Sequence, residues 1–83
     1  MIVEVFGKPS CVYCNYAKTL LEERQQEYAY IDIVANESSL KELFQRVPDA
    51  KTVPQIFIDG EHVGGFDDLR EWYKIKDTET TKT

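Results

Sequence analysis

The sequence predicts a single α/β domain, with a four-stranded mixed sheet flanked by three helices in the order β-α-β-α-β-β-α. Three features predict this class. Short apolar runs alternate with segments of helical periodicity, a two-residue turn separates the last two apolar runs, and the chain has only 83 residues, enough for one small core. Hydrophobic residues make up 42% of the chain and charged residues 30%, so a chain disordered throughout is excluded.

The chain begins with a strand and a helix. A buried strand is predicted at residues 2–6, where every residue except Glu4 is β-branched or aromatic. A loop follows at residues 7–10. A helix is predicted over residues 12–27, because apolar residues recur at i, i+3, i+4, i+7 and i+8 without glycine or proline. These apolar residues are Tyr13, Tyr16, Ala17, Leu20 and Leu21.

The next two elements repeat this order. The apolar run at residues 28–34 predicts a second strand. The helix after it is expected to be capped by Asn36 or by Ser39, since Ser39 stands three residues before Glu42, the spacing of a capping box. Because a helix joins the first two strands, they should be parallel, with a right-handed crossover.

A hairpin and a last helix complete the fold. A strand at residues 55–58, the turn Asp59-Gly60 and a short return strand at residues 62–63 form the hairpin. The acidic pair Asp67-Asp68 favours the start of a helix, where the macrodipole stabilises negative charge.

The domain is expected to span residues 1–75, and a polar, threonine-rich tail at residues 76–83 is expected to be frayed. The larger aromatic residues of the helices are expected in the core rather than as stacking platforms for a ligand. They are Tyr16, Phe44, Trp72 and Tyr73.

The charge pattern and the short apolar runs argue against two classes of partner. The formal net charge is −5 and no segment is basic, so a nucleic acid is not an expected partner. No apolar run approaches the roughly 20 residues that span a bilayer, and residues 1–6 lack the basic start of a signal peptide. We therefore expect a cytoplasmic protein that binds neither nucleic acid nor membrane, and we expect a monomer.

The two cysteines, Cys11 and Cys14, form a C-x-x-C motif where the first loop meets the first helix. Unpaired N–H groups and the positive end of the dipole favour a thiolate there. The pKa of a cysteine at such a position typically falls from about 8.5 to roughly 3.5–7.5, and Lys8 adds positive charge nearby. We predict that Cys11 is the nucleophile and Cys14 the resolving thiol of a disulfide exchange reaction.

A metal site is the first alternative for these cysteines. Structural zinc needs four ligands, and the chain offers two cysteines and His62, which is expected to face solvent from the hairpin. Zinc would require a dimer or help from carboxylates, so no metal ligand is predicted. An inert pair of thiols is the second alternative.

Further motifs accompany the cysteines. Thr52-Val53-Pro54 precedes the third strand, and Gly64-Gly-Phe-Asp-Asp68 follows the hairpin. Together with Lys8 and Cys11-Val-Tyr-Cys14 at these separations, they resemble the glutaredoxins, and the resemblance covers residues 2–75. It implies a thioredoxin-like fold and a glutathione-dependent thiol–disulfide oxidoreductase.

The resemblance also implies substrates and partners. Such an enzyme reduces protein disulfides and protein–glutathione mixed disulfides through its dithiol, with glutathione as co-substrate and no tightly bound cofactor. Its partners would be glutathione and disulfide-bearing or glutathionylated proteins, with ribonucleotide reductase as one candidate.

By the same resemblance, glutathione would lie across a cleft beside Cys11. Pro54 would be cis and would turn the Val53 backbone toward the cysteinyl group of glutathione, as in the addition of a strand. The γ-glutamyl end would meet Asp67 and Asp68, where a helix start suits its carboxylate and the Asp68 carboxylate suits its ammonium. The other residues implied on this side are Tyr13, Thr52 and Gly65.

The glycine carboxylate of glutathione would meet Lys8 and, by the same resemblance, Arg46. The loop at residues 47–51 is irregular against the family pattern, so Gln45 and Lys51 are alternatives to Arg46.

Two other functions stay open. Val12 and Phe66 stand where many glutaredoxins have proline and cysteine, and the chain is also similar to the glutaredoxin-like electron donors of ribonucleotide reductase, which thioredoxin reductase reduces. The Asp67-Asp68 pair favours glutathione as the reductant. Some glutaredoxins instead hold an iron–sulfur cluster between two copies of the residue that matches Cys11, with glutathione as an additional ligand.

Overall fold

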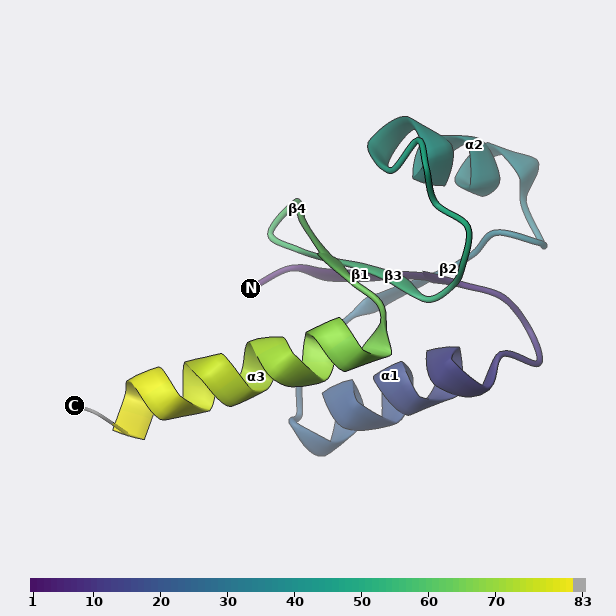
Figure 1. Ribbon diagram of the computed structural model, residues 1–83. Helices are drawn as coiled ribbons and strands as arrows, with labels where there is room; N and C mark the ends of the chain where they lie inside the picture. The colour runs from purple at the N-terminus through teal and green to yellow at the C-terminus, as the bar shows by residue number, and fades with distance from the viewer. Residues whose placement is uncertain (82–83) are drawn as a thin grey trace.

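The computed structural model describes residues 1–81 and has a four-stranded sheet in the order β2-β1-β3-β4 between two helical layers. Helix α2 covers one face, and α1 and α3 cover the other (Figure 1). The predicted element order and mixed sheet are confirmed. The elements are β1 (Val3–Gly7), α1 (Val12–Glu23), β2 (Ala29–Asp32), α2 (Glu37–Arg46), β3 (Gln55–Ile58), β4 (Glu61–Gly64) and α3 (Phe66–Thr81).

Strand β1 lies inside the sheet. It pairs in parallel with β2, where Val5 is the partner of Tyr30, and antiparallel with β3, where Val5 is the partner of Ile56. Strand β3 in turn pairs antiparallel with the edge strand β4. Because β1 and β3 are covered on both faces, their sequences are almost continuously apolar rather than alternating.

Successive side chains of the inner strands fill two separate cores. One cluster lies between the sheet and helices α1 and α3, and its fully buried members include Val5, Ala17, Leu21, Ile56 and Leu69. A smaller cluster lies under α2 and contains Phe6, Leu43, Val47 and Phe57. Burial of each large side chain contributes about 1.5–3 kcal/mol, so both helical layers are fixed to β1, which ends at the cysteine loop, and to β3, which starts beside it.

The end of α1 differs from the prediction for a local reason, and the start of α2 agrees with one of the two predicted caps. Helix α1 ends at Glu23 rather than residue 27, because Gln25 has a left-handed φ of 57° that a helix does not continue through. Helix α2 is capped by Asn36, whose Oδ1 accepts the Ser38 N–H at 3.0 Å. Ser39, the alternative cap, lies inside the helix.

Two of the aromatic residues expected in the core are on the surface. Tyr16 is 51% exposed and Phe44 is 45% exposed, whereas Tyr73 is buried and Trp72 packs partly buried against the core. The Tyr16 ring contacts the Phe66 ring, with centroids 5.7 Å apart. Cys14 and Ala17, on either side of Tyr16 in α1, are completely buried. Helical periodicity therefore identified the part of α1 that packs on the sheet but overestimated the width of its buried face.

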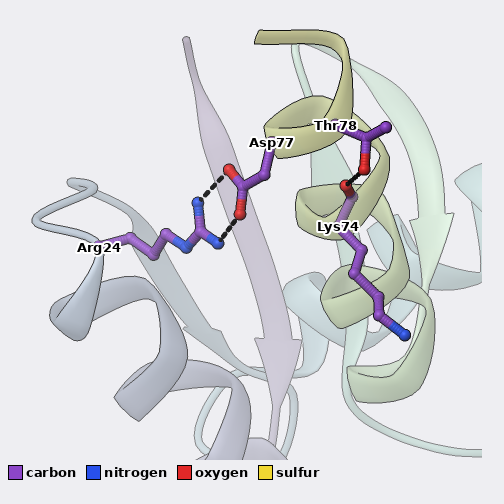
Figure 2. Close-up of polar contacts among 4 residues, drawn as sticks. All are labelled: Arg24, Lys74, Asp77 and Thr78. Atoms are coloured by element: carbon purple, nitrogen blue, oxygen red, sulfur yellow. Dashed lines mark hydrogen bonds and ion pairs between the residues drawn. The ribbon is translucent and has the colours of Figure 1, made fainter. Parts of the chain in front are cut away.

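Helix α3 continues to Thr81 rather than ending in a frayed tail after residue 75. Figure 2 shows one cause, an ion pair between the residue that caps α1 and the fourth turn of α3. Arg24 Nη1 donates to Asp77 Oδ1 at 2.8 Å, and Arg24 Nη2 donates to Asp77 Oδ2. The guanidinium also lies 4.3 Å from the centre of the Tyr73 ring. These contacts attach the polar end of α3 to α1.

One side chain of α3 also bonds to the backbone of its own helix. The Thr78 hydroxyl donates to the Lys74 carbonyl at 2.9 Å (Figure 2), one turn back along the helix. The division into a domain at residues 1–75 and a tail at residues 76–83 stays a prediction.

We predict that the pKa of Asp77 lies below its ordinary value of 3.8, because Arg24 hydrogen-bonds to the carboxylate. The stability from this pair is therefore present above the ordinary value and is lost as the pH falls through the lower pKa of the folded state. In Arg24→Gln the pKa of Asp77 should return to the ordinary range, as measured by NMR titration of its carboxyl carbon. Identical titrations of Asp77 in the two proteins would contradict this account.

Candidate active site

The two cysteines lie where the loop after β1 enters α1. Cys11 is the N-cap of α1, with extended backbone, and its Sγ accepts the Cys14 N–H at 3.1 Å. Cys14 lies one turn further on and is completely buried, whereas Cys11 is 8% exposed. The two form a disulfide, with Cα atoms 5.2 Å apart. The helix start thus presents a backbone donor to the more accessible sulfur.

The segment Thr52-Val53-Pro54 lies against Cys11. The Val53–Pro54 peptide bond is cis, as the resemblance implied, and the Val53 carbonyl oxygen lies 3.7 Å from Cys11 Sγ. The backbone that an extended ligand would pair with is therefore next to the sulfur that it would react with.

Gln55 holds this segment in place, although the sequence analysis did not assign it to the site. Its side chain is buried, with Nε2 donating to the Thr52 carbonyl at 2.9 Å and Oε1 paired with His62 Nε2 at 2.7 Å. The sequence could have indicated this role, because Gln55 is the first residue of an otherwise apolar strand. A buried amide has to find hydrogen-bond partners. His62 is exposed as expected, but it is not isolated.

A pocket of about 300 Å³ opens on the α3 side of Val53. It is lined by Tyr13, Thr52, Val53, Pro54, Gly65, Phe66, Asp67 and Asp68. At its edge, Asp68 Oδ2 accepts the Gly65 N–H at 3.0 Å, which is the contact from the third helical residue to the N-cap in a capping box. Gly64 has a φ of +123° and the Asp68 carboxylate fills the space that a Cβ would need, so both features require glycine there.

A smaller pocket of about 160 Å³ lies on the α2 side of Val53. Lys8 and Lys51 bring positive charge to it, and its apolar wall includes Leu40 and Phe44. Thr52 and Val53 line both pockets. The backbone of this segment therefore separates a basic pocket from one that is edged by two aspartates.

Arg46 lines neither pocket. Its guanidinium contacts Glu4 at 2.9 and 3.2 Å and Glu42 at 2.9 Å, and it lies 4.8 Å from the centre of the Phe57 ring. The hydrogen bonds with Glu4 raise the pKa of Arg46 above its ordinary value. The last turn of α2 thus directs Arg46 to the sheet, and Lys51, one of its two alternatives, lines the basic pocket instead.

Gly7 lies at the back of the site between a sulfur and a phenol. A Cβ built on Gly7 would lie 3.0 Å from Cys14 Sγ and would clash with the Tyr30 hydroxyl. Tyr30 Oη donates to the Lys8 carbonyl at 3.3 Å. Burial and, to a smaller extent, the charge of Asp32 raise the pKa of Tyr30, so this phenol stays protonated as a donor.

Neither a metal-binding cluster nor a membrane-spanning helix is found in residues 1–81. Within residues 1–81 there is no group of three histidine, cysteine, aspartate or glutamate residues that could hold a metal ion. In the same part of the chain, every helix is too short or too polar to cross a bilayer.

The predicted site residues, apart from Arg46, gather at the sulfurs and the two pockets, and comparison with known proteins identifies the family. The glutaredoxin family model matches residues 3–63. The chain belongs to the glutaredoxin family. Glutaredoxin 1 of Salmonella typhimurium is 41% identical over 80 residues, which cover 89% of this chain and 92% of that protein. Glutaredoxin 3 of Escherichia coli is 42% identical over 67 residues, 81% of this chain and 80% of that protein.

A solved glutaredoxin structure has the same fold. A buckwheat glutaredoxin–glutathione complex superposes with a TM-score of 0.77 and 30% identity, covering 89% of this chain and 69% of its own. As a glutaredoxin, the protein has a thioredoxin-like fold and is a thiol–disulfide oxidoreductase with Cys11 and Cys14 as its redox-active pair; dependence on glutathione is typical of the family. The predicted family, fold and enzyme class are confirmed.

We predict that Gly7→Ala destabilises the protein by about 1–3 kcal/mol, because the methyl group overpacks the space between Cys14 and Tyr30. Tyr30→Leu removes the obstructing ring, so the double variant should recover at least half of the loss. Urea denaturation of the four proteins measures this coupling. Additive effects of the two substitutions would show that Tyr30 does not set the requirement for glycine.

Proposed function

We propose that the enzyme reduces protein disulfides and protein–glutathione mixed disulfides in the cytoplasm, with glutathione as co-substrate and without a tightly bound cofactor. The observation that carries the proposal is the position of Cys11 Sγ, which accepts a backbone N–H at the start of α1 and lies beside the Val53 carbonyl. A reducing cytosol suits a cysteine pair that is oxidised only during turnover.

The two cysteines have environments that support different roles. Reduction of the disulfide leaves the Cys11 sulfur facing the Cys14 N–H and the positive end of the α1 dipole. Both stabilise a thiolate, the species that attacks in thiol–disulfide exchange. Cys14 is completely buried, and burial favours the neutral thiol. These environments support Cys11 as the nucleophile and Cys14 as the resolving thiol.

Glutathione would bind as a short extended chain along residues 52–54. Its cysteinyl amide would pair with the Val53 backbone, which brings its sulfur to Cys11. Its glycine carboxylate would lie toward the two lysines of the basic pocket, and its γ-glutamyl end toward the two aspartates that start α3. The different charges at the two ends of the cleft support one direction of binding.

The reaction is a series of thiol–disulfide exchanges, in which each new S–S bond replaces one that breaks. The Cys11 thiolate attacks one sulfur of the substrate disulfide, and the other sulfur leaves as a thiolate and takes up a proton. Cys14 loses its proton and attacks the Cys11 sulfur, so that the substrate leaves as a dithiol and the Cys11–Cys14 disulfide remains. One glutathione opens this disulfide as a Cys11 adduct, and a second removes the first as glutathione disulfide.

Turnover of a glutathionylated protein with glutathione and glutathione reductase tests the proposal. We expect turnover with this couple and none when thioredoxin reductase is the only source of electrons. The opposite result would replace the proposal with the alternative of a glutaredoxin-like electron donor.

We predict that Cys11→Ser abolishes turnover of every substrate, because the remaining thiol, Cys14, is completely buried and cannot attack a substrate disulfide. Cys14→Ser should lose activity on protein disulfides, accumulate the mixed disulfide in mass spectra, and keep activity on glutathionylated proteins, since that reaction needs one cysteine. An active Cys11→Ser enzyme beside an inactive Cys14→Ser enzyme would reverse the roles.

We predict that Lys8→Gln and Lys51→Gln each raise the KM for glutathione by about two- to five-fold, the size expected for one exposed charge contact. Arg46→Gln removes the same charge, so it is the matched control. It should leave that KM unchanged and lower the stability by about 1 kcal/mol or less, through loss of the Glu4 contact. A raised KM in Arg46→Gln alone would return Arg46 to the binding site.

A further inference from the structure

A groove of about 490 Å³ lies between the β3–β4 hairpin and α3, and the proposed function makes no use of most of it. It is larger than either pocket beside Val53. Asp68 lines both this groove and the pocket at the start of α3, so the two hollows adjoin. A chain that reaches Cys11 across that pocket can therefore continue into the groove.

The groove is strongly acidic. Asp59, Glu61, Asp68 and Glu71 contribute four carboxylates from the hairpin turn, β4 and α3, against the single ammonium of Lys76. Asp59 accepts the Ile2 N–H at 2.7 Å and Asp68 accepts the Gly65 N–H. Within the described part of the chain, the exposed side chains of Glu61 and Glu71 form no ion pair or hydrogen bond.

The groove also has an aromatic and aliphatic wall formed by Val63, Trp72 and Ile75. Ile75 is 52% exposed. The Lys76 ammonium lies 5.4 Å from the centre of the Trp72 ring, so the chain itself demonstrates that a lysine fits this aromatic surface. Lysine and arginine bury their aliphatic stems on such surfaces while their charges meet acids.

We propose that this groove docks a lysine- or arginine-bearing segment of the protein substrate while the substrate cysteine reacts at Cys11. The inference deepens the proposed function and rests on it. Three observations carry it: the excess of carboxylates, the wall on which a lysine already lies, and the shared residue Asp68, which joins the groove to the pocket at Val53. Because the charges are exposed, they should act mainly on encounter with the substrate and weaken with salt.

Trp72 is the only tryptophan of the chain, so its fluorescence reports on the groove without any turnover. The first probe is a short cysteine-free peptide with three lysines, compared with the same peptide carrying three glutamines. We expect the lysine peptide to change the Trp72 emission with a Kd at least three-fold below that of the glutamine peptide.

Two double variants separate the groove from the overall charge. Glu61→Gln/Glu71→Gln neutralises two acids of the groove, whereas Glu23→Gln/Glu27→Gln neutralises two exposed acids at the end of α1 and in the loop after it. The groove variant should weaken binding of the lysine peptide by about three- to ten-fold, the size expected for two exposed charge contacts. The control variant should bind it as the natural sequence does.

Turnover gives the second readout. The substrates are the glutathionylated forms of a lysine-bearing and a glutamine-bearing peptide and one small, uncharged disulfide. The groove variant should lower kcat/KM about three- to ten-fold for the lysine peptide at low salt, and leave the other two substrates unchanged.

Each outcome has a defined meaning. The docking proposal is overturned if the lysine peptide leaves the Trp72 emission unchanged, or if the groove and control variants weaken its binding equally. If the natural sequence turns over none of the three substrates with glutathione, the proposed function is contradicted instead. The fluorescence titration then still decides whether the groove binds a cationic segment.

Discussion

The hydrogen bond from the Cys14 N–H to the Cys11 sulfur is the contact on which the chemistry of this protein depends. It exists because α1 starts at Val12, so that Cys11 caps the helix rather than lying within it. An N-cap side chain normally offers oxygen to the free N–H groups of the first turn. Here sulfur takes that place, and the donor that completes the helix also stabilises negative charge on the nucleophile.

The sheet register brings the other parts of the site to this sulfur. Phe6, near the end of β1, pairs with Gln55 at the start of β3, so the loop before β3 lies at the same sheet edge as the cysteine loop. Gly64 at the end of β4 pairs with Ile56, and α3 therefore starts at that edge too. Segments far apart in the sequence meet there because the strands that carry them are locked by two cores. The cleft, with its basic and acidic ends, follows from strand pairing.

Much of this could be predicted from the sequence, because strands, turn and motifs are local patterns. The apolar runs gave the sheet, Asp59-Gly60 gave the hairpin, and the cysteine spacing gave the redox pair. Arg46 could not be placed, since the direction of a side chain at the end of α2 depends on Glu4, which is distant in the sequence. The end of α3 depends likewise on Arg24. Long-range ion pairs, and the exposure of single helix residues such as Tyr16 and Phe44, have no local pattern.

The most direct test is the rate at which Cys11 is alkylated by iodoacetamide as a function of pH, in the Cys14→Ser variant, which keeps the backbone N–H but has one thiol. The account predicts an inflection below about pH 7.5, well under the roughly 8.5 of an ordinary cysteine, and a rate near neutrality far above that of N-acetylcysteine. An inflection at the ordinary value, with an ordinary rate, would contradict it, because the start of α1 would then not stabilise the thiolate.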